Sequence, residues 1–129
     1  MKIMVINPNS SQHMTRHLDE VLQQIKDADT QLTVCCPEGG PMAIESAYDE
    51  AMCLPGLLPL VKKAETEGYD AVILACFSDP GLEQAREIVR SFNATYDDVL
   101  VEPKALLPNN EVCMRLPGTD GKAKMSKSL

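Results

Sequence analysis

The chain has no tryptophan and few other aromatic residues. Its 129 residues include three Tyr and two Phe, so aromatic side chains make up 4% of the sequence. The hydrophobic core must therefore be built mainly from aliphatic side chains. Long apolar runs are also missing, and none approaches the ~20 residues that a membrane-spanning helix needs. We therefore expect no membrane partner.

Cysteines are present but lack a pairing or metal-binding pattern. An odd number, one adjacent pair and no C-x-x-C spacing argue against a disulfide framework and against a zinc site. His13 and His17 lie one helical turn apart without a third ligand, so we predict no metal site. The turn-forming Asn7-Pro8-Asn9 interrupts the only apolar start, which argues against a signal peptide. A reducing cytoplasm is the expected location. The five cysteines are Cys35, Cys36, Cys53, Cys76 and Cys113.

Basic residues are scarce relative to acidic ones. Lys and Arg number 12 against 19 Asp and Glu, giving a net charge of −7. Residues 1–92 hold 7 basic and 14 acidic residues, whereas residues 93–129 hold 5 of each. An acidic body without a broad basic surface predicts that nucleic acid is not a partner.

Three short apolar runs alternate with helical patterns along residues 1–92. A turn cluster follows each run, and amphipathic spacing follows each turn, which is typical of a parallel sheet covered by helices. Ser10 or Ser11 can cap the first helix. Pro55-Gly56 predicts a break in the second. The expected strands are 2–6, 31–35 and 71–76. The first helix is expected to carry its apolar face from Met14 to Ile25 and to end at 27–29, 44–67 is expected to form one long helix or two, and the last helix spans 82–92.

These elements predict an α/β fold with three layers. Right-handed crossovers favour the strand order 2-1-3, with helices on both faces of the sheet. Both sheet edges would be open, which favours homo-oligomers formed through an edge. Residues 93–129 form a separate, largely irregular tail, because only Val99–Val101 and Val112–Met114 are strand-like.

A ligand of such a sheet binds beyond the carboxyl ends of its strands. Three loops meet there in the predicted fold: 7–11, 35–41 and 76–81. Cys76 would lie before a helix, whose positive N-terminal end favours a thiolate that could act as a base or nucleophile. A cysteine at the end of a buried strand can equally be a small core residue.

Three motifs resemble the hydantoin and allantoin racemases of the aspartate/glutamate racemase superfamily. They are NPNSS at 7–11, GGPMAIESAYDE at 39–50 and ACFSDPGL at 75–82. The resemblance implies a cofactor-independent isomerase for a small-molecule substrate, in which two cysteines act on opposite faces of a carbon. It makes Cys76 the first of these catalytic residues. Asn7, Ser10 and Ser11 would line the pocket, and Ser78 would donate to the substrate.

The second cysteine of that family belongs to a second α/β half, which has no counterpart in this sequence. Cys113 is the only later cysteine, and its neighbours Glu111-Val112-Cys113-Met114-Arg115 do not match the family. Racemisation needs an acid–base group on each face of the carbon. We therefore expect the half-site to be weak or inactive.

The tail resembles another family, the bacterial tryptophanyl-tRNA synthetases. The similarity begins near Arg86, includes VEPKALL, and ends in RLPGTDGKAKMSKS. It implies that Lys124 and Lys127 bind the phosphates of ATP, the only cofactor that this ligase alternative would use. The two resemblances overlap at 82–89, which indicates a chimera. A product of fold recombination without evolved function is the third hypothesis.

Overall fold

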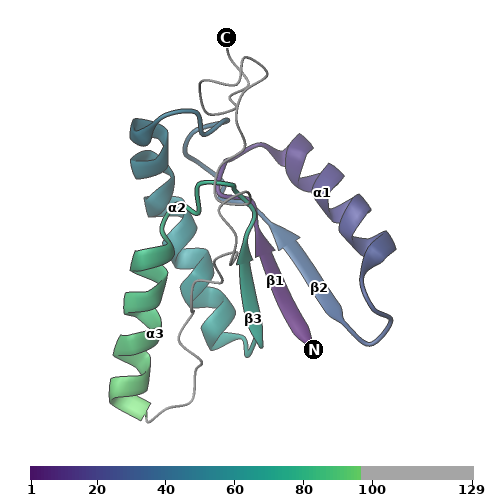
Figure 1. Cartoon of the computed structure of the whole chain (residues 1–129), viewed down its shortest axis with the longest axis vertical. Helices are drawn as coiled ribbons and strands as arrows, with labels where there is room; N and C mark the ends of the chain where they lie inside the picture. The colour runs from purple at the N-terminus through teal and green to yellow at the C-terminus, as the bar shows by residue number, and fades with distance from the viewer. Residues whose placement is uncertain (97–129) are drawn as a thin grey trace, which may run out of the picture.

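A computed structural model describes residues 1–96 of the chain, and the predicted tail lies outside this part apart from its first four residues. The predicted alternation of strands and helices is confirmed (Figure 1). The elements are β1 (Lys2–Ile6), α1 (Gln12–Ile25), β2 (Gln31–Cys35), α2 (Ala47–Thr66), β3 (Ala71–Leu74) and α3 (Leu82–Tyr96).

The three strands form a parallel sheet in the order β2-β1-β3, as predicted. Ile6 in β1 is opposite Cys35 in β2 and Leu74 in β3. Side chains alternate along a strand, so Met4 and Ile6 share one face of the sheet while Val5 points to the other. All three are 2% exposed or less, because β1 has a strand on each side and helices above and below.

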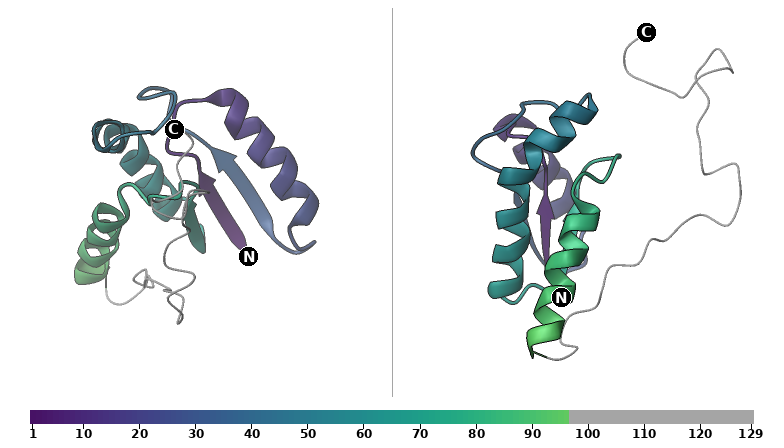
Figure 2. Two further views of the ribbon diagram at one scale, coloured as in Figure 1. Left: turned by 45° about the horizontal axis from the view of Figure 1, so that its top comes forward. Right: turned by 90° about the vertical axis from the view of Figure 1, so that its left-hand side faces the viewer.

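Helices cover both faces of this sheet. A stripe on α2, formed by Cys53, Leu57, Val61 and Ala64, packs against Met4 and Ile6, and Ala85 of α3 joins the same cluster. Helix α1 lies beside β2 on the opposite face (Figures 1 and 2). The core is aliphatic, as the lack of aromatic residues predicts. None of the helices within residues 1–96 is long and apolar enough to cross a membrane.

Helix α2 corrects one prediction, because it runs unbroken through Pro55 and Pro59. A proline inside a helix removes one N–H and leaves the carbonyl four residues earlier without its helical donor. Both prolines are exposed and lie four residues apart, on the same side of the helix. Water can therefore hydrate the freed carbonyls, while the buried stripe on the opposite side holds the helix to the sheet.

Two other boundaries differ from the sequence pattern. Strand β3 ends at Leu74 instead of Cys76, because the chain turns there and the Cys76 N–H donates to the Leu74 carbonyl at 3.0 Å. Helix α3 continues past Phe92 to Tyr96, since no glycine or proline interrupts those four residues. The end of the helix therefore lies beyond the boundary expected at residue 92.

Polar side chains stabilise the N-termini of two helices. Ser11, not Ser10, caps α1, and its hydroxyl accepts the Met14 N–H. At α2, Ser46 and Asp49 form a reciprocal capping box. The hydrogen bond from the Ser46 hydroxyl and the Glu45 backbone N–H lower the pKa of the Asp49 carboxyl.

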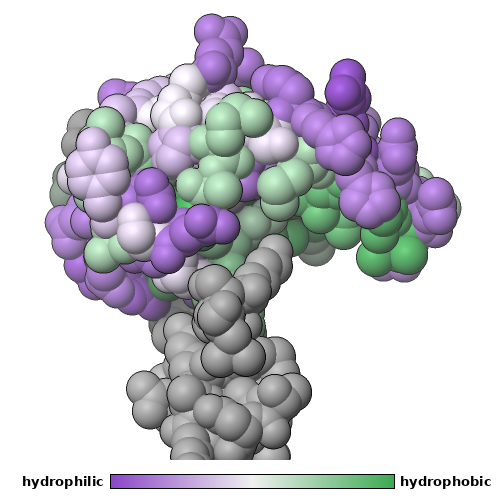
Figure 3. Space-filling model, turned by 90° about the horizontal axis from the view of Figure 1, so that it is seen from above, coloured by the Kyte–Doolittle hydropathy of each residue, from purple (hydrophilic) through white to green (hydrophobic). Residues whose placement is uncertain are grey.

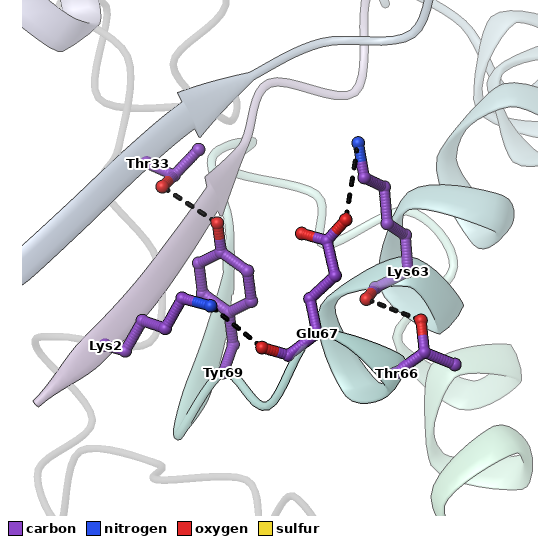
Figure 4. A network of polar contacts seen from close by, with 6 residues as sticks. All are labelled: Lys2, Thr33, Lys63, Thr66, Glu67 and Tyr69. Carbon is purple, nitrogen blue, oxygen red and sulfur yellow. Dashed lines mark hydrogen bonds and ion pairs between the residues drawn. The ribbon is translucent and has the colours of Figure 1, made fainter.

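A network of polar contacts connects the elements at the end of the sheet where β1 and β3 begin (Figure 4). The Lys2 ammonium donates to the Glu67 carbonyl at 2.8 Å and lies 4.1 Å from the centre of the Tyr69 ring. The Tyr69 hydroxyl donates to Thr33 Oγ1 at 2.9 Å. These contacts attach the turn between α2 and β3 to both other strands.

Gly56 allows α2 to approach the loop that follows β2. A Cβ atom at this position would lie 2.6 Å from the Cβ of Pro37, a buried residue. Such a distance is far inside van der Waals contact, so either the helix or the loop would have to move. The glycine next to Pro55 therefore serves close packing and does not end the helix.

We predict that Gly56→Ala destabilises the protein. Overpacking typically costs about 1–3 kcal/mol, whereas alanine gains about 1 kcal/mol of helix propensity, so a net loss near 1 kcal/mol is expected. Urea denaturation followed by circular dichroism measures this change. Gly39→Ala is the matched control, because a Cβ there meets nothing within 4 Å. A Gly56→Ala variant as stable as the parent would contradict the close approach.

Candidate active site at the carboxyl edge of the sheet

Main-chain hydrogen bonds bring the three predicted loops together at one edge of the sheet. The Asn7 N–H donates to the Cys35 carbonyl at 2.8 Å, and the Ser10 N–H donates to the Pro41 carbonyl at 2.9 Å. The Ala75 N–H donates to the Ile6 carbonyl at 2.8 Å. The loop after β1 therefore lies between the loops after β2 and β3, as the strand order requires.

The side chain of Asn7 is buried inside its own loop. Its amide nitrogen donates to Asn9 Oδ1 at 2.8 Å and to Thr15 Oγ1 at 3.0 Å, so both of its N–H groups have partners. Asn9 Oδ1 also accepts the Ser11 N–H at 2.9 Å. Asn7 is 4% exposed and thus shapes the loop from beneath. Its predicted place in the pocket lining stays a prediction.

The two serines of this loop have different surroundings. Ser11 is buried, and its hydroxyl is the cap of α1. Ser10 is partly exposed, and its hydroxyl lies 3.0 Å from the Gly40 carbonyl and 3.2 Å from the Pro41 carbonyl. Ser10 therefore connects the first loop to the second while keeping part of its side chain at the surface.

Cys76 lies in the third loop, half-buried and outside the core cluster. Its sulfur is 3.6 Å from the Ser78 hydroxyl, so the structure brings these two predicted site residues together. Asp79 has a φ of 49° and Gly81 a φ of 80°, and this tight turn leads directly into α3 at Leu82. Cys76 thus lies in the turn that precedes the N-terminus of α3.

Sequence reasoning missed three residues around this site. Asn9 and Thr15 complete the buried network of Asn7, and the spacing of Asn-Pro-Asn before a helix is a signal for such a loop. Cys53 had no signal, because it belongs to the apolar stripe of α2. Its thiol is fully buried and donates to the Glu50 carbonyl at 3.1 Å. Burial and then the negative charge of a Cys76 thiolate raise its pKa.

Apolar side chains interleave with polar ones around these loops (Figure 3). Met14 and Met42 are 51% and 67% exposed, and their sulfur atoms lie 3.6 Å from Asn9 Nδ2 and 3.5 Å from Ser10 Oγ. Phe77, next to Cys76, is 91% exposed. Apolar and polar side chains are therefore both accessible at this edge of the sheet.

The sequence profile described as Asp/Glu/Hydantoin racemase matches residues 3–91, which include all three loops and the elements that hold them. The chain belongs to this racemase family. Hydantoin racemases of Pseudomonas sp. (strain NS671) and Rhizobium meliloti are 46% and 42% identical to it over 88 and 90 residues. These matches cover 68% and 70% of this chain but 35% and 37% of the relatives.

The solved structure of the allantoin racemase from Klebsiella pneumoniae has the same arrangement. It matches with a TM-score of 0.64 and 37% sequence identity, over 67% of this chain and 36% of that one. The chain therefore spans little more than a third of the racemases that it matches. The racemase-like α/β fold is thus shown both by sequence and by structure.

A second group of relatives overlaps with the racemase match. Tryptophan–tRNA ligases of Streptococcus pneumoniae (strain ATCC BAA-255 / R6) and Clostridium longisporum are each 51% identical over 74 and 76 residues. These cover 55% and 57% of this chain and 22% of each ligase. The parts of this chain covered by the racemases and by the ligases add up to more than its whole length. Part of the sequence is therefore similar to both groups.

We predict that Cys53 and Cys76 are alkylated at different rates. Cys53 is fully buried and its pKa is raised, so iodoacetamide near neutral pH should modify it at least about tenfold more slowly than the half-buried Cys76. Peptide mapping by mass spectrometry measures both rates. In Cys76→Ser the neighbouring charge is lost, so the pKa of Cys53 falls. Equal labelling of both thiols in the folded parent would contradict the placement of Cys76 at the rim.

Proposed function

We propose that Cys76 is the acid–base thiol of one half of a racemase site, acting on a hydantoin or amino-acid type of substrate without a cofactor. The observation that carries this proposal is the position of its sulfur, 3.6 Å from Ser78 at the edge where the three loops meet. Membership of the racemase family and the names of the relatives support the reaction class and the substrate class.

The proposed step is proton abstraction next to a carbonyl group. The Cys76 thiolate takes the proton from the carbon, forming an S–H bond. The C–H electron pair forms a double bond to the carbonyl carbon, and the π pair of the carbonyl group moves onto its oxygen. In this proposal the Ser78 hydroxyl and the positive N-terminal end of α3 stabilise the negative charge. Ser10, held in a loop that Asn7 and the α1 cap Ser11 support, would position the substrate.

Inversion of the carbon needs a second acid–base group on its other face. In residues 1–96, Cys53 cannot take this role, because it is fully buried among the core residues of α2. For the described residues the proposal therefore assigns a one-sided reaction: the thiol removes a proton and returns one to the same face. Such a site exchanges hydrogen with solvent while the configuration of the carbon is retained.

We predict slow exchange without racemisation. An optically pure 5-substituted hydantoin in D₂O should gain deuterium at C5 faster with the protein than in buffer, because the S–H proton is replaced by deuterium before it returns. Proton NMR measures this exchange, and circular dichroism measures inversion, which should stay at the rate of the buffer. Losing one proton-transfer group typically costs about 10²–10⁴-fold.

Two variants make this test specific. Cys76→Ser should reduce exchange to the rate of the buffer, whereas Cys36→Ser, which alters another half-buried thiol at the same edge, should leave it unchanged. Exchange that survives in Cys76→Ser would refute the proposed base. Racemisation as fast as exchange would show that a second group completes the site.

A synthetase-like function is the second candidate, and the 51% identity to the ligases favours it. It would use Lys124 and Lys127, which lie outside the described residues, to bind the phosphates of ATP. We propose instead that the chain is chimeric and that α3 contains the junction. In support, α3 runs without interruption through 82–89, where the motifs of the two resemblances meet, and the matches to the two groups of relatives share part of the chain.

We predict that ATP does not bind usefully to the terminal lysines. Isolated lysines give only a salt-screened attraction, whereas a phosphate site needs backbone donors that converge on the ligand. Titration with ATP up to sub-millimolar concentration should leave the NMR signals of residues 122–128 unshifted. Saturable shifts centred on Lys124 and Lys127 would favour the synthetase function. Lys104→Ala, which removes one positive charge elsewhere in the sequence, is the control for an effect of charge alone.

A further inference from the structure

Cys53 is a thiol that the proposed reaction leaves unused. It lies in α2, is 0% exposed, and donates a hydrogen bond to the Glu50 carbonyl of the same helix at 3.1 Å. A buried cysteine of this kind usually serves as a small apolar core residue. Its position relative to Cys76 nevertheless matters, because a thiol beside a more accessible thiol can form a disulfide with it.

The loop after β3 packs on the part of α2 that carries Cys53. A Cβ atom at Gly81 would lie 2.9 Å from Leu54 Cδ2 and 3.1 Å from Leu57 Cδ2, so this end of the loop touches α2 directly. Leu54 is next to Cys53 in the sequence, and Leu57 follows one helical turn later in the same buried stripe. The loop 76–81 therefore meets α2 close to Cys53.

The other end of this loop keeps Cys76 near the core. Cys53 belongs to the core cluster against which Leu74 packs. The Cys76 N–H donates to the Leu74 carbonyl at 3.0 Å, which folds the chain back immediately after β3. The two thiols also sense each other, because the negative charge of Cys76 is one of the causes that raise the pKa of Cys53. Cys76 is thus held beside the part of α2 that contains Cys53.

The other cysteines that the structure describes lie on the far side of the central strand. Cys35 ends β2, and Ile6 of β1 separates it from Leu74 at the end of β3. Two strand spacings make the distance between the Cα atoms of Cys35 and Leu74 roughly 10 Å. A disulfide needs Cα atoms within about 7 Å of each other. Within residues 1–96, Cys53 is therefore the partner that the geometry favours for Cys76.

We propose that Cys53 and Cys76 form a reversible disulfide that switches the candidate site off in the presence of a peroxide. Cys76 is half-buried at the edge of the sheet and is the thiol that meets the oxidant. The buried Cys53 then resolves the oxidised form. The bond itself depends only on the packing of the loop on α2. Its effect on catalysis rests on the function proposed for Cys76.

The bond forms in two steps, with hydrogen peroxide as the oxidant. The Cys76 thiolate attacks a peroxide oxygen, so an S–O bond forms, the O–O bond breaks and hydroxide leaves. The sulfur is thereby oxidised to a sulfenic acid, and the peroxide is reduced. Cys53 then loses its proton and attacks this sulfur, so an S–S bond forms and the S–O bond breaks. The hydroxide that leaves takes the proton and becomes water.

The first step makes the second one easier. A sulfenic acid is neutral, so the thiolate charge that helps to raise the pKa of Cys53 disappears when Cys76 is oxidised. The Cys53 thiol then loses its proton more readily. A dithiol reductant reverses the switch by thiol–disulfide exchange, which restores both thiols and oxidises the reductant.

Peptide mapping of the full-length chain tests the disulfide. After treatment with a small excess of hydrogen peroxide, digestion without a reductant should release a peptide that links Cys53 to Cys76. Its mass should be lower than that of its two reduced parts by two hydrogen atoms, and dithiothreitol should separate it. Absence of this linked peptide, or a link mainly from Cys76 to another cysteine, would overturn the proposal.

Dimedone, which captures sulfenic acids, identifies the resolving thiol. In Cys53→Ala the sulfenic acid has no partner, so dimedone should label Cys76 severalfold more than in the parent. Cys36→Ser, which alters a half-buried thiol at the same edge, should be labelled like the parent. Equal labelling of the parent and Cys53→Ala would refute the role of Cys53. If circular dichroism shows that Cys53→Ala is unfolded, the peptide map of the parent decides.

The deuterium exchange assay separates this proposal from the proposed function. If Cys76 is the base, peroxide should lower exchange to the rate of the buffer, and dithiothreitol should restore it. Exchange that is unchanged after complete formation of the disulfide would overturn the switch. A linked peptide from a protein whose reduced form shows no exchange would support the disulfide and refute only the function proposed for Cys76.

Discussion

The pairing of β1 with a parallel strand on each side is the constraint on which the other features depend. Ile6 is fully buried, and its carbonyl accepts the Ala75 N–H just beyond β3. One residue later, the Asn7 N–H donates to the end of β2. The last residue of the central strand and the first residue of its loop thus connect both neighbours. The loops that carry Ser10 and Cys76 therefore both start where hydrogen bonds hold the carboxyl end of β1 in place.

Much of this fold could be predicted from local patterns, and the misses have physical causes. The short apolar runs and the turn clusters identify the strands because parallel strands are buried on both faces. The continuity of α2 could not be predicted from Pro55 and Gly56. It depends on which side of the helix faces solvent and on the approach of Pro37, and both are tertiary facts.

The candidate site shows the same division between local and tertiary information. The motifs name residues at this edge, and the Cys76 sulfur lies 3.6 Å from the Ser78 hydroxyl, while the roles of these residues stay predictions. Motifs could not reveal that both N–H groups of the Asn7 side chain are used inside the loop, or that Cys53 lies close enough to respond to charge on Cys76. Such facts depend on packing between elements that are distant in sequence.

Helix α3 shows how few demands a surface helix places on its own sequence. Each turn is hydrogen-bonded within the helix, so a new sequence must preserve only the phase of the apolar positions to keep the preceding packing intact. Ala85 and Ile88 maintain this phase against α2. An exposed face accepts almost any residue. A helix at the surface of a sheet therefore accepts many different sequences. The sequence of a central strand such as β1 must instead suit two neighbouring strands and the packing on both faces of the sheet.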